Sequence, residues 1–357
     1  MNVAPWHALD SWRRMAGRRM EAAGLAPVES PSECVHRAPG LELLRYLGAA
    51  PGGPVLLIVP APIKRHYIWD LQPSCSVVRR ALEQGFTVYL ARWTDTDDDH
   101  GIERCIELLA GGTALIREAT GVAPQLAGHS LGGTLCAILA ARHGAQLSSL
   151  TLIEAPLHFG ADAGAFAPLV GSTPAGAPLA TQQTPVAGSV LNLAAAMASP
   201  REFIWDRHLD GWAAAAQGRD AMQTYLLATR WSLDEFALPA RLFNEVVDLL
   251  YRQDRFMRGE LQVQGRRVGP ADLQVPLAVV VDPRSETIPA RSIDPFLASA
   301  ASDDLLRLEY HGDSGVLLQH IGALIGQNAH RLLWPRLLAW MTAHHPGAAA
   351  DVRPSAR

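Results

Sequence analysis

Apolar residues gather in short runs along the first half of the chain, and segments with helical spacing separate these runs. The runs predict buried strands at residues 52–62, 86–93, 123–128 and 147–156. The intervening segments predict helices at residues 76–84, 101–121 and 132–144. This alternation is typical of a parallel sheet with helices on both faces. The first half of the chain therefore predicts an α/β core.

The pattern changes at about Leu157. Residues 160–189 are rich in Ala, Gly, Pro, Ser and Thr, and helical patterns follow at residues 190–197 and 239–256. Strand patterns return only at residues 276–282 and 305–312, which indicates a cap inserted between two parts of one sheet. The predicted organisation is an N-terminal helical segment (1–34), core (35–156), cap (157–272), core (273–345) and flexible tail (346–357).

The N-terminal segment predicts an amphipathic helix. Trp6, Leu9, Trp12 and Met15 fall near one helical face, opposite several arginines. The favoured interpretation is a first helix docked on the rest of the chain. The alternative is a helix whose apolar face contacts a lipid or polymer surface.

Composition narrows the classes of function. The chain has 357 residues, of which 48% are apolar and 18% charged, so it can bury a large core in one enlarged domain or two small ones. A net charge of −4 gives no general attraction to nucleic acid. The sequence has no zinc-ligand spacing, dinucleotide glycine fingerprint or Walker loop, so we expect no metal and no cofactor.

Cysteine usage and hydropathy indicate the compartment. The four cysteines are widely separated and nothing at the start resembles a signal peptide, which favours a reduced, cytoplasmic setting. No stretch approaches the ~20 apolar residues of a membrane span.

The candidate nucleophile is Ser130, in the pattern Gly-His-Ser-Leu-Gly at residues 128–132. A predicted strand precedes this pattern and a predicted helix follows it, which is the context of a nucleophile elbow. The flanking glycines fit because the turn leaves no room for side chains.

A serine nucleophile needs a histidine to accept its proton and a carboxylate to orient that histidine. In the chain order of α/β-hydrolases the acid follows the serine and the histidine comes last. His311, at the end of the last predicted strand, and His320, in the loop beyond it, fit this order equally well. The residues alone do not choose between them.

The chain resembles polyhydroxyalkanoate synthases from about residue 35 to residue 341. The resemblance lies in "PVLLIVPAPIKRHYIWDLQPSCSVVRRALEQGFTVYLARW", "GGTL", "APLHFG", "LNLAAAMASPREF", "RWSLDEFALP" and "HIGALIGQNAHRLLWPRLLAW". It implies an α/β-hydrolase fold, a 3-hydroxyacyl ester or acyl-coenzyme A substrate, and His320 as the base. Its implied partners are a polymer granule, an accessory synthase subunit or a second copy of the chain. Because its N-terminal region is short, the chain is closer in size to the synthases that work with an accessory subunit than to the long single-subunit synthases.

The chain departs from the synthase pattern at two positions. The synthases carry cysteine where this chain has Ser130, and the position expected for their aspartate falls on Ser285, which cannot ionise. We rank Glu286 first as the acid, then Asp282, and then Glu154, because some hydrolases place the acid after the strand that follows the elbow helix.

The oxyanion hole needs two backbone donors. One is the amide of Leu131. The other comes from the loop after the first core strand, where Pro60 and Pro62 lack an N–H and leave Ala61 or Ile63. The resemblance implies Ile63.

These observations predict a serine-dependent enzyme that transfers acyl groups, more often to water than to a growing polymer. The alternatives are a true synthase and a silent granule-binding or subunit-binding protein, which the irregular acid loop keeps open. Five aromatic residues of the cap are candidates for an apolar acyl pocket: Trp205, Trp212, Tyr225, Trp231 and Phe236.

Overall fold

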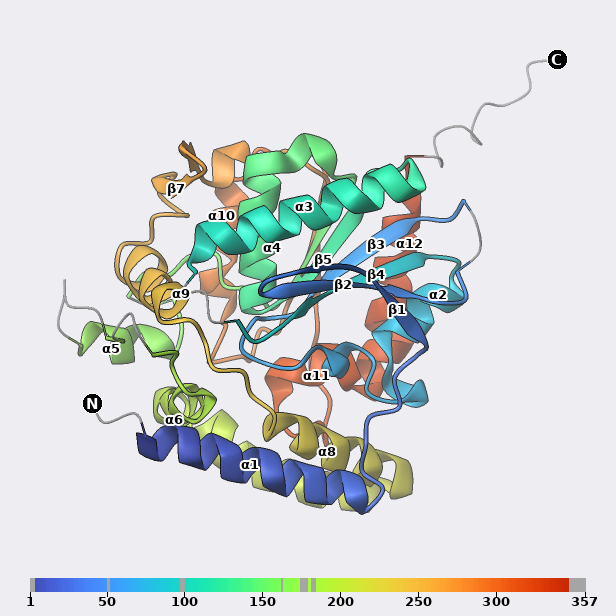
Figure 1. The fold of residues 1–357 in the computed structure, drawn as a ribbon, viewed down its shortest axis with the longest axis vertical. Helices are drawn as coiled ribbons and strands as arrows, with labels where there is room; N and C mark the ends of the chain where they lie inside the picture. The colour runs from blue at the N-terminus through green and yellow to red at the C-terminus, as the bar shows by residue number, and fades with distance from the viewer. Residues whose placement is uncertain are drawn as a thin grey trace.

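One eight-stranded sheet forms the centre of the protein (Figure 1). The computed structural model describes residues 4–49, 52–96, 100–161, 163–173, 179–180 and 184–346, and the statements below concern these residues. The strand order is β1-β2-β4-β3-β5-β6-β9-β10. Most of the tail predicted at 346–357 lies outside the described residues.

The sheet is parallel from β4 to β10, whereas β2 runs antiparallel to both β1 and β4. Its strands are β1 (Ser32–Ala38), β2 (Leu41–Tyr46), β3 (Val55–Val59), β4 (Thr87–Trp93), β5 (Gln125–His129), β6 (Ser149–Ile153), β9 (Leu277–Val281) and β10 (Leu305–Glu309). The mostly parallel α/β sheet predicted from the alternation of strands and helices is therefore confirmed.

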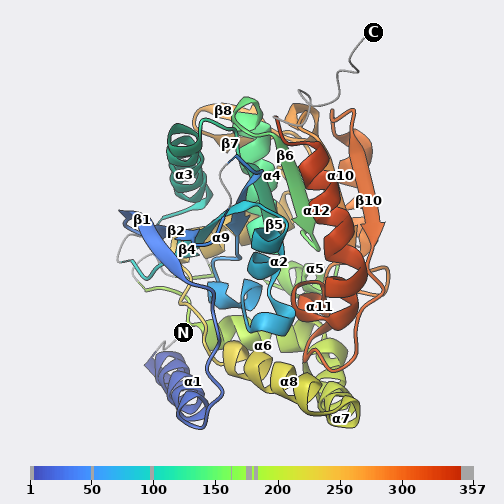
Figure 2. The same ribbon diagram turned by 90° about the vertical axis from the view of Figure 1, so that its right-hand side faces the viewer.

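Alternation along the strands divides the core into two layers. In β3, Val55 and Leu57 belong to one apolar cluster, and Leu56 and Ile58 belong to the other. The first cluster includes α3 (Ile102–Thr120), α4 (Leu131–His143) and α10 (Asp294–Ser299). The second includes α2 (Val77–Glu83), α11 (Gly322–Ile325) and α12 (Trp334–Ala343). Helices thus cover both faces of the sheet (Figure 2).

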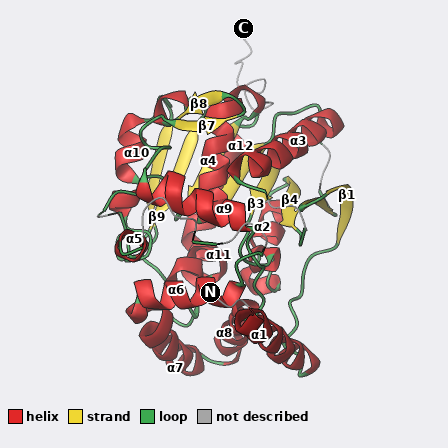
Figure 3. Ribbon diagram, turned by 60° about the vertical axis from the view of Figure 1, so that its left-hand side comes forward, coloured by secondary structure: helices red, strands yellow, loops and turns green. Residues whose placement is uncertain are grey.

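The segment between β6 and β9 divides into two regions. Its middle part lies beyond the end of the sheet that carries the elbow (Figure 3), and it contains α5 (Phe166–Gly171), α6 (Gly188–Ala198), the π-helix η4 (Arg201–Asp206), α7 (Arg207–Gln217) and α8 (Arg219–Ser232). The later part contains α9 (Ala240–Glu245), the π-helix η5 (Val246–Arg252) and the hairpin of β7 (Leu261–Val263) and β8 (Arg266–Val268). Its buried side chains join the α3–α4 layer, so this part packs on the core.

Helix α1 (Ala4–Ala22) docks on α6 and α8, as the favoured interpretation of the N-terminal segment predicted. The face that it buries carries Asp10 and Gly17, whereas Leu9, Trp12 and Met15 are exposed. The helix is therefore docked through its polar and small residues. Among the described residues, the structure contains no helix of the length and apolarity that crossing a bilayer requires.

Candidate active site

Ser130 lies at a strained turn between β5 and α4. Its backbone has φ 55° and ψ −135°, in the left-handed half of the Ramachandran plot that residues with a Cβ rarely occupy. Its amide donates to the carbonyl of Ile153, which ties the turn to the neighbouring strand β6 at 3.1 Å. Such strain persists only where the surrounding structure imposes it, and it is the geometry of a nucleophile elbow.

Three glycines allow the elbow to pack against its neighbours. A Cβ on Gly132 would lie 2.6 Å from the carbonyl carbon of Pro60, and one on Gly133 would lie 2.5 Å from the Cβ of Ala155. A Cβ on Gly128 would meet the Cα of Gly133 at 2.7 Å. Gly128 and Gly132 of the predicted elbow pattern, and Gly133 after them, therefore lie where a larger side chain would clash with the neighbouring segments.

His320 lies on the short 3₁₀ helix η8 (Gln319–Ile321), and its Nδ1 is 3.2 Å from Oε2 of Glu154. Glu154 follows β6 directly, at the edge of the sheet where Ser130 follows the neighbouring strand β5. A carboxylate can only accept, so this bond places the proton of a neutral His320 on Nδ1 and leaves Nε2 as the basic nitrogen. That is the tautomer a general base for serine requires.

Burial raises the pKa of Glu154, and the bond from His320 partly offsets this effect. The negative charges of Asp282 and Glu202 raise the pKa of Glu154 further. Among the described residues, its buried Oε1 has no hydrogen-bond partner. Glu154 also has a left-handed backbone, with φ 43°, while its amide donates to Val280 at 2.9 Å. A buried, strained carboxyl with its only partner on a histidine is typical of a functional site.

The three candidate acids have different partners in the structure. Glu286, the first choice, is half exposed and forms an ion pair with Arg201 of the cap at 3.2 Å. Asp282, the second choice, is buried, but its carboxylate accepts the amide of Arg284 at 2.8 Å. The pairing with His320 is made by Glu154, the third choice. The loop after β9 turns Glu286 toward Arg201 of the cap. The position of Glu286 in the sequence does not indicate this direction.

The two candidate histidines also separate clearly. His311 has a side chain that is 72% exposed and lies 3.8 Å from Glu309, at the end of its own strand. His320 is mostly buried beside Glu154. Of the two candidate histidines, the structure therefore brings His320 beside a candidate acid.

The loop after β3 lies beside the start of α4, as the contact between Pro60 and Gly132 requires. Leu131 is the first residue of α4, so its amide has no acceptor within the helix. The carbonyl of Ile63 accepts the amide of Phe236 at 3.3 Å, which fixes the orientation of the peptide group that follows it. The two candidate oxyanion donors, Leu131 and Ile63, thus belong to adjoining segments.

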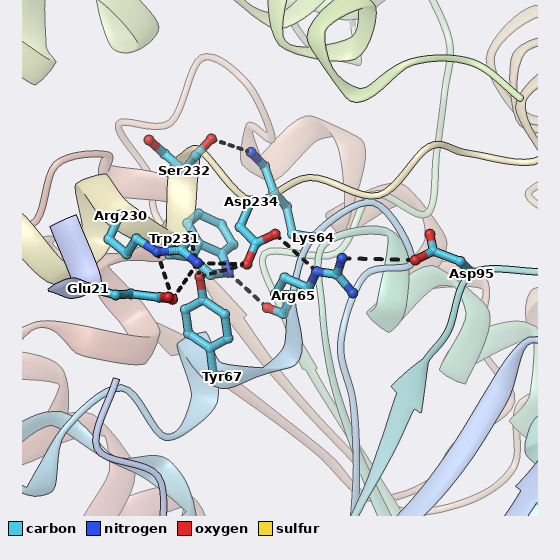
Figure 4. A network of polar contacts seen from close by, with 9 residues as sticks. All are labelled: Glu21, Lys64, Arg65, Tyr67, Asp95, Arg230, Trp231, Ser232 and Asp234. Atoms are coloured by element: carbon cyan, nitrogen blue, oxygen red, sulfur yellow. Dashed lines mark hydrogen bonds and ion pairs between the residues drawn. The ribbon is translucent and has the colours of Figure 1, made fainter. Parts of the chain in front are cut away.

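A polar network holds this loop against the cap (Figure 4). Lys64 donates to the carbonyl of Ser232 at 3.2 Å and forms an ion pair with Glu235. Arg65 binds Asp234 at 3.2 Å. Burial lowers the pKa of Lys64, and the charge of Glu235 partly offsets this effect. No local pattern in the sequence indicates these pairs, because their members lie about 170 positions apart.

The network continues from the loop to α1. Arg230 binds both Asp234, at 3.3 Å, and Glu21 of α1, at 2.5 Å. Its Nη1 also lies 3.3 Å from the hydroxyl of Tyr67, which follows the loop. Because 94% of the Arg230 side chain is shielded from solvent, its charge depends on these partners. The first helix, the cap and the loop after β3 therefore form one connected unit.

The five cap aromatics do not share one pocket. Trp205 and Trp212 are 69% and 78% exposed, so the expectation that they line an acyl site is wrong. Trp231 is buried and donates to the carbonyl of Arg65 at 2.8 Å. The ring of Phe236 lies 3.7 Å from the guanidinium carbon of Arg65.

A cavity of about 320 Å³ adjoins the loop after β3. Pro62, Trp93, Phe236 and Leu242 provide apolar walls, and Asp95 is among its polar residues. Ser130 is not among the lining residues. The cavity therefore lies next to the segment of Ile63, outside the immediate surroundings of the candidate nucleophile.

Comparison with known proteins gives relatives by sequence. The chain is 26% identical over 359 residues to the poly(3-hydroxyalkanoate) polymerase subunit PhaC of Haloarcula marismortui, covering 94% of this chain and 72% of that protein. It is 27% identical to the PhaC subunit of Haloferax mediterranei, covering 87% of this chain and 64% of that protein. For the PhaC subunit of Allochromatium vinosum the identity is 23%, with 92% and 94% covered. No protein-family model matches the chain.

Comparison of structures gives the fold. The monoacylglycerol lipase of Paleococcus ferrophilus superimposes with a TM-score of 0.54 and 15% identity, over 85% of this chain and 99% of the lipase. The esterase RhEst1 from Rhodococcus sp. ECU1013 gives a TM-score of 0.52 and 13% identity, over 87% and 99%. Together with the parallel sheet and the strained turn at Ser130, these likenesses show that the chain has the α/β-hydrolase fold.

Proposed function

We propose that this protein is a serine-dependent acyl-transfer enzyme that hydrolyses 3-hydroxyacyl esters or thioesters. The observation that carries the proposal is the convergence of a strained serine elbow, a histidine and a buried carboxyl from three separate segments, Ser130, His320 and Glu154. The chain has the fold of lipases and esterases, and its relatives by sequence are polymerases of 3-hydroxyalkanoates. Both comparisons point to chemistry at an acyl carbon.

The proposed reaction has two steps. Nε2 of His320 takes the proton of Ser130 as Oγ attacks the acyl carbon, and the amides of Leu131 and Ile63 stabilise the oxyanion. Collapse of the tetrahedral adduct breaks the bond to the alcohol or thiol, which receives the proton from His320 and departs. His320 then takes a proton from water, which attacks the acyl-serine ester. The bond between the acyl carbon and Oγ breaks, Oγ of Ser130 receives the proton from His320, and the 3-hydroxy acid is released. Glu154 stabilises the imidazolium in both steps.

Serine in place of cysteine favours hydrolysis. A thioester intermediate transfers its acyl group downhill to a hydroxyl group, because a thioester becomes an ester. An acyl-serine is already an oxoester, so transfer to a polymer hydroxyl is nearly balanced while transfer to water remains favourable. The nucleophile thus removes the driving force for elongation, although loading from acyl-coenzyme A stays downhill.

Polymerisation is the second candidate function, and the similarity to three PhaC subunits favours it. A silent scaffold is disfavoured, because the irregular loop at Ser285 is not the only source of a carboxyl. Glu154 provides one at 3.2 Å from His320. Glu154 is therefore a candidate for the carboxyl that the irregular loop lacks at Ser285.

One incubation separates these functions. Purified protein is mixed with 3-hydroxybutyryl-coenzyme A, and free acid, free coenzyme A and insoluble polymer are measured. We expect free acid from the parent, and a loss of about 10⁶-fold in Ser130→Ala. Polymer from the parent would establish the alternative. No turnover, together with no fluorophosphonate labelling of Ser130, would establish a silent protein.

The variant Ser130→Cys tests the role of the nucleophile. It restores a thioester intermediate, so we expect polymer from the same substrate and less hydrolysis of simple esters. Unchanged products would show that access of water, and not the nucleophile, decides between acid and polymer. Ser130→Thr is a matched control because it keeps the oxoester.

We further propose that the protein works at the surface of an apolar polymer in the cytoplasm. Nine exposed large apolar side chains lie on α1, α6, η4 and α7, namely Leu9, Trp12, Met15, Leu193, Met197, Ile204, Trp205, Leu209 and Trp212. The contacts of α1 with α6, and of α6 with η4, make these elements neighbours. Extensive exposed apolar surface marks an interaction site. A polyester granule, an accessory subunit and a second copy of the chain compete for it, and an insoluble substrate favours the granule.

Sedimentation with purified polyester granules tests this surface. We expect the parent to sediment with the granules, and Trp205→Ser together with Trp212→Ser to remain in solution. A matched control, Leu305→Ser, replaces an exposed apolar residue on the edge strand β10. If the tryptophan variant loses dimers, seen by light scattering, and keeps its binding to granules, the surface belongs to a second copy of the chain.

A further inference from the structure

His129, the last residue of β5, is in contact with the candidate base His320. It directly precedes Ser130, and its side chain is buried. Its Nε2 is 2.7 Å from the backbone carbonyl of His320. Its ring also lies against the ring of His320, with centroids 4.4 Å apart and planes inclined by 36°. One side chain thus links the strand of the nucleophile to the loop of the base.

The bond to His320 determines the tautomer of His129. A carbonyl oxygen only accepts, so Nε2 of His129 carries the proton, and the neutral ring has no proton on Nδ1. Burial lowers the pKa of His129 well below its ordinary value, and the proximity of His320 lowers it further. The bond to the carbonyl opposes this shift in part. His129 is therefore a neutral donor.

Neutrality matters because His320 must become a cation during the proposed reaction. A second cation at 4.4 Å would oppose that charge. A neutral ring in the same place holds the loop without this repulsion. The carboxyl of Glu154 faces Nδ1 of His320 from β6, so the imidazolium has an anion on one side and an uncharged ring on the other.

We propose that His129 is a positioning residue, which holds the backbone of His320 so that Nε2 of this base faces Ser130. This inference rests on the proposed function. His320 is then fixed at two points, through its carbonyl from β5 and through Nδ1 from β6. Loss of the first point leaves a buried carbonyl without a donor and frees the loop to move.

Two substitutions separate the hydrogen bond from the volume of the side chain. His129→Gln keeps an uncharged N–H at a similar reach, whereas His129→Leu keeps a similar size and removes the donor. For hydrolysis of a p-nitrophenyl acyl ester we expect His129→Leu to lower kcat by about tenfold to a hundredfold with little change in KM. We expect His129→Gln to retain most of kcat. Thermal unfolding of both variants checks that the fold is intact.

The pH profile gives a readout that a purely structural role would not move. In His129→Leu the acidic limb of kcat/KM should shift, because His320 is no longer held against Glu154, whereas His129→Gln should keep the parent profile. Equal losses in both variants, or no loss in His129→Leu, would overturn the proposal.

A nuclear magnetic resonance measurement separates failure of this inference from failure of the proposed function. With ¹⁵N-labelled histidines, His129 should remain neutral, with its proton on Nε2, as the pH falls through the ordinary pKa of a histidine. This result does not depend on turnover, so it holds even if Ser130 proves inactive toward fluorophosphonate. Titration of His129 near its ordinary pKa, or a proton on Nδ1, would overturn the inference alone.

Discussion

At the scale of single residues, the structure places chemistry where the backbone is strained. Ser130 and Glu154 both have positive φ, and both sit at the ends of adjacent parallel strands. A residue with a Cβ pays a cost of order 1–3 kcal/mol in such a conformation. Glu154 contacts His320, and Ser130 follows the strand next to that of Glu154, so two of the five non-glycine residues with positive φ in the described part of the chain lie at the candidate site.

Glu154→Gln tests whether this carboxyl is the acid. The amide cannot balance the charge on His320 and allows the wrong tautomer, so we expect kcat for ester hydrolysis to fall by about 10³-fold to 10⁴-fold. Glu286→Gln is the matched control and should change kcat less than threefold, because Glu286 pairs with Arg201. A large loss in Glu286→Gln and a small one in Glu154→Gln would restore the order of acids expected from the sequence.

The sequence could predict Ser130 because its signal is local. The glycine spacing, the preceding strand and the following helix all lie within about twenty residues. Which carboxyl meets the base depends on how two distant loops turn, so local sequence could not rank the candidate acids. Glu154 and Glu286 both follow core strands, and only the tertiary structure shows that one turns toward His320 and the other toward Arg201. His129 was missed because its bond to His320 spans 191 positions.

At the scale of elements, α1 shows that amphipathic spacing predicts a helix better than it predicts the buried face. The helix buries Asp10, whose carboxylate accepts the amides of Gly188 and Ser189 at the start of α6, at 3.0 and 2.8 Å. Asp10 thus acts as an N-cap supplied by another helix. A contact between segments about 180 residues apart leaves no periodic pattern in either segment.

Asp10→Ala should therefore destabilise the docking of α1 and α6. Two buried amides lose their acceptor, and we expect the free energy of unfolding to fall by about 2–4 kcal/mol in urea titrations. Trp12→Ala, on the exposed face of the same helix, is the control and should change it by about 0.5 kcal/mol or less. The opposite ranking would show that the apolar face of α1 holds it to the protein.

At the scale of the whole molecule, the parallel sheet was predictable from sequence because its central strands, such as β3 and β9, are entirely apolar and helices such as α4 follow their strands closely. The positions of the cap helices were not predictable from sequence, because these helices are held by ion pairs between distant residues. Examples are the pairs of Lys64 with Glu235 and of Arg230 with Glu21. These pairs join α1, the cap and the core. Charges distributed through such contacts make the stability of the molecule depend on pH.

His330 offers a direct test of this dependence. It is buried between α2 and the start of α12, where its Nδ1 accepts from Arg80 and its Nε2 donates to the carbonyl of Leu324, both at 2.8 Å. Burial, followed by the charge of Arg80, lowers its pKa to about 4. Between about pH 6.5 and pH 4, His330 therefore binds a proton in the unfolded chain but stays neutral in the folded protein. The free energy of unfolding thus falls as the pH falls through this window.

The expected loss is about 2–3 kcal/mol between pH 7.5 and pH 4.5, in excess of that shown by His330→Gln, which keeps an N–H donor and does not titrate. Urea unfolding of both proteins at the two pH values measures it. His129 also has a lowered pKa, but it is present in both proteins and its contribution cancels in the difference. Equal losses in the parent and in His330→Gln would show that His330 accepts its proton in the folded state. A larger loss in His330→Gln would contradict the sign of the argument, since the variant lacks the group that the folded state keeps neutral.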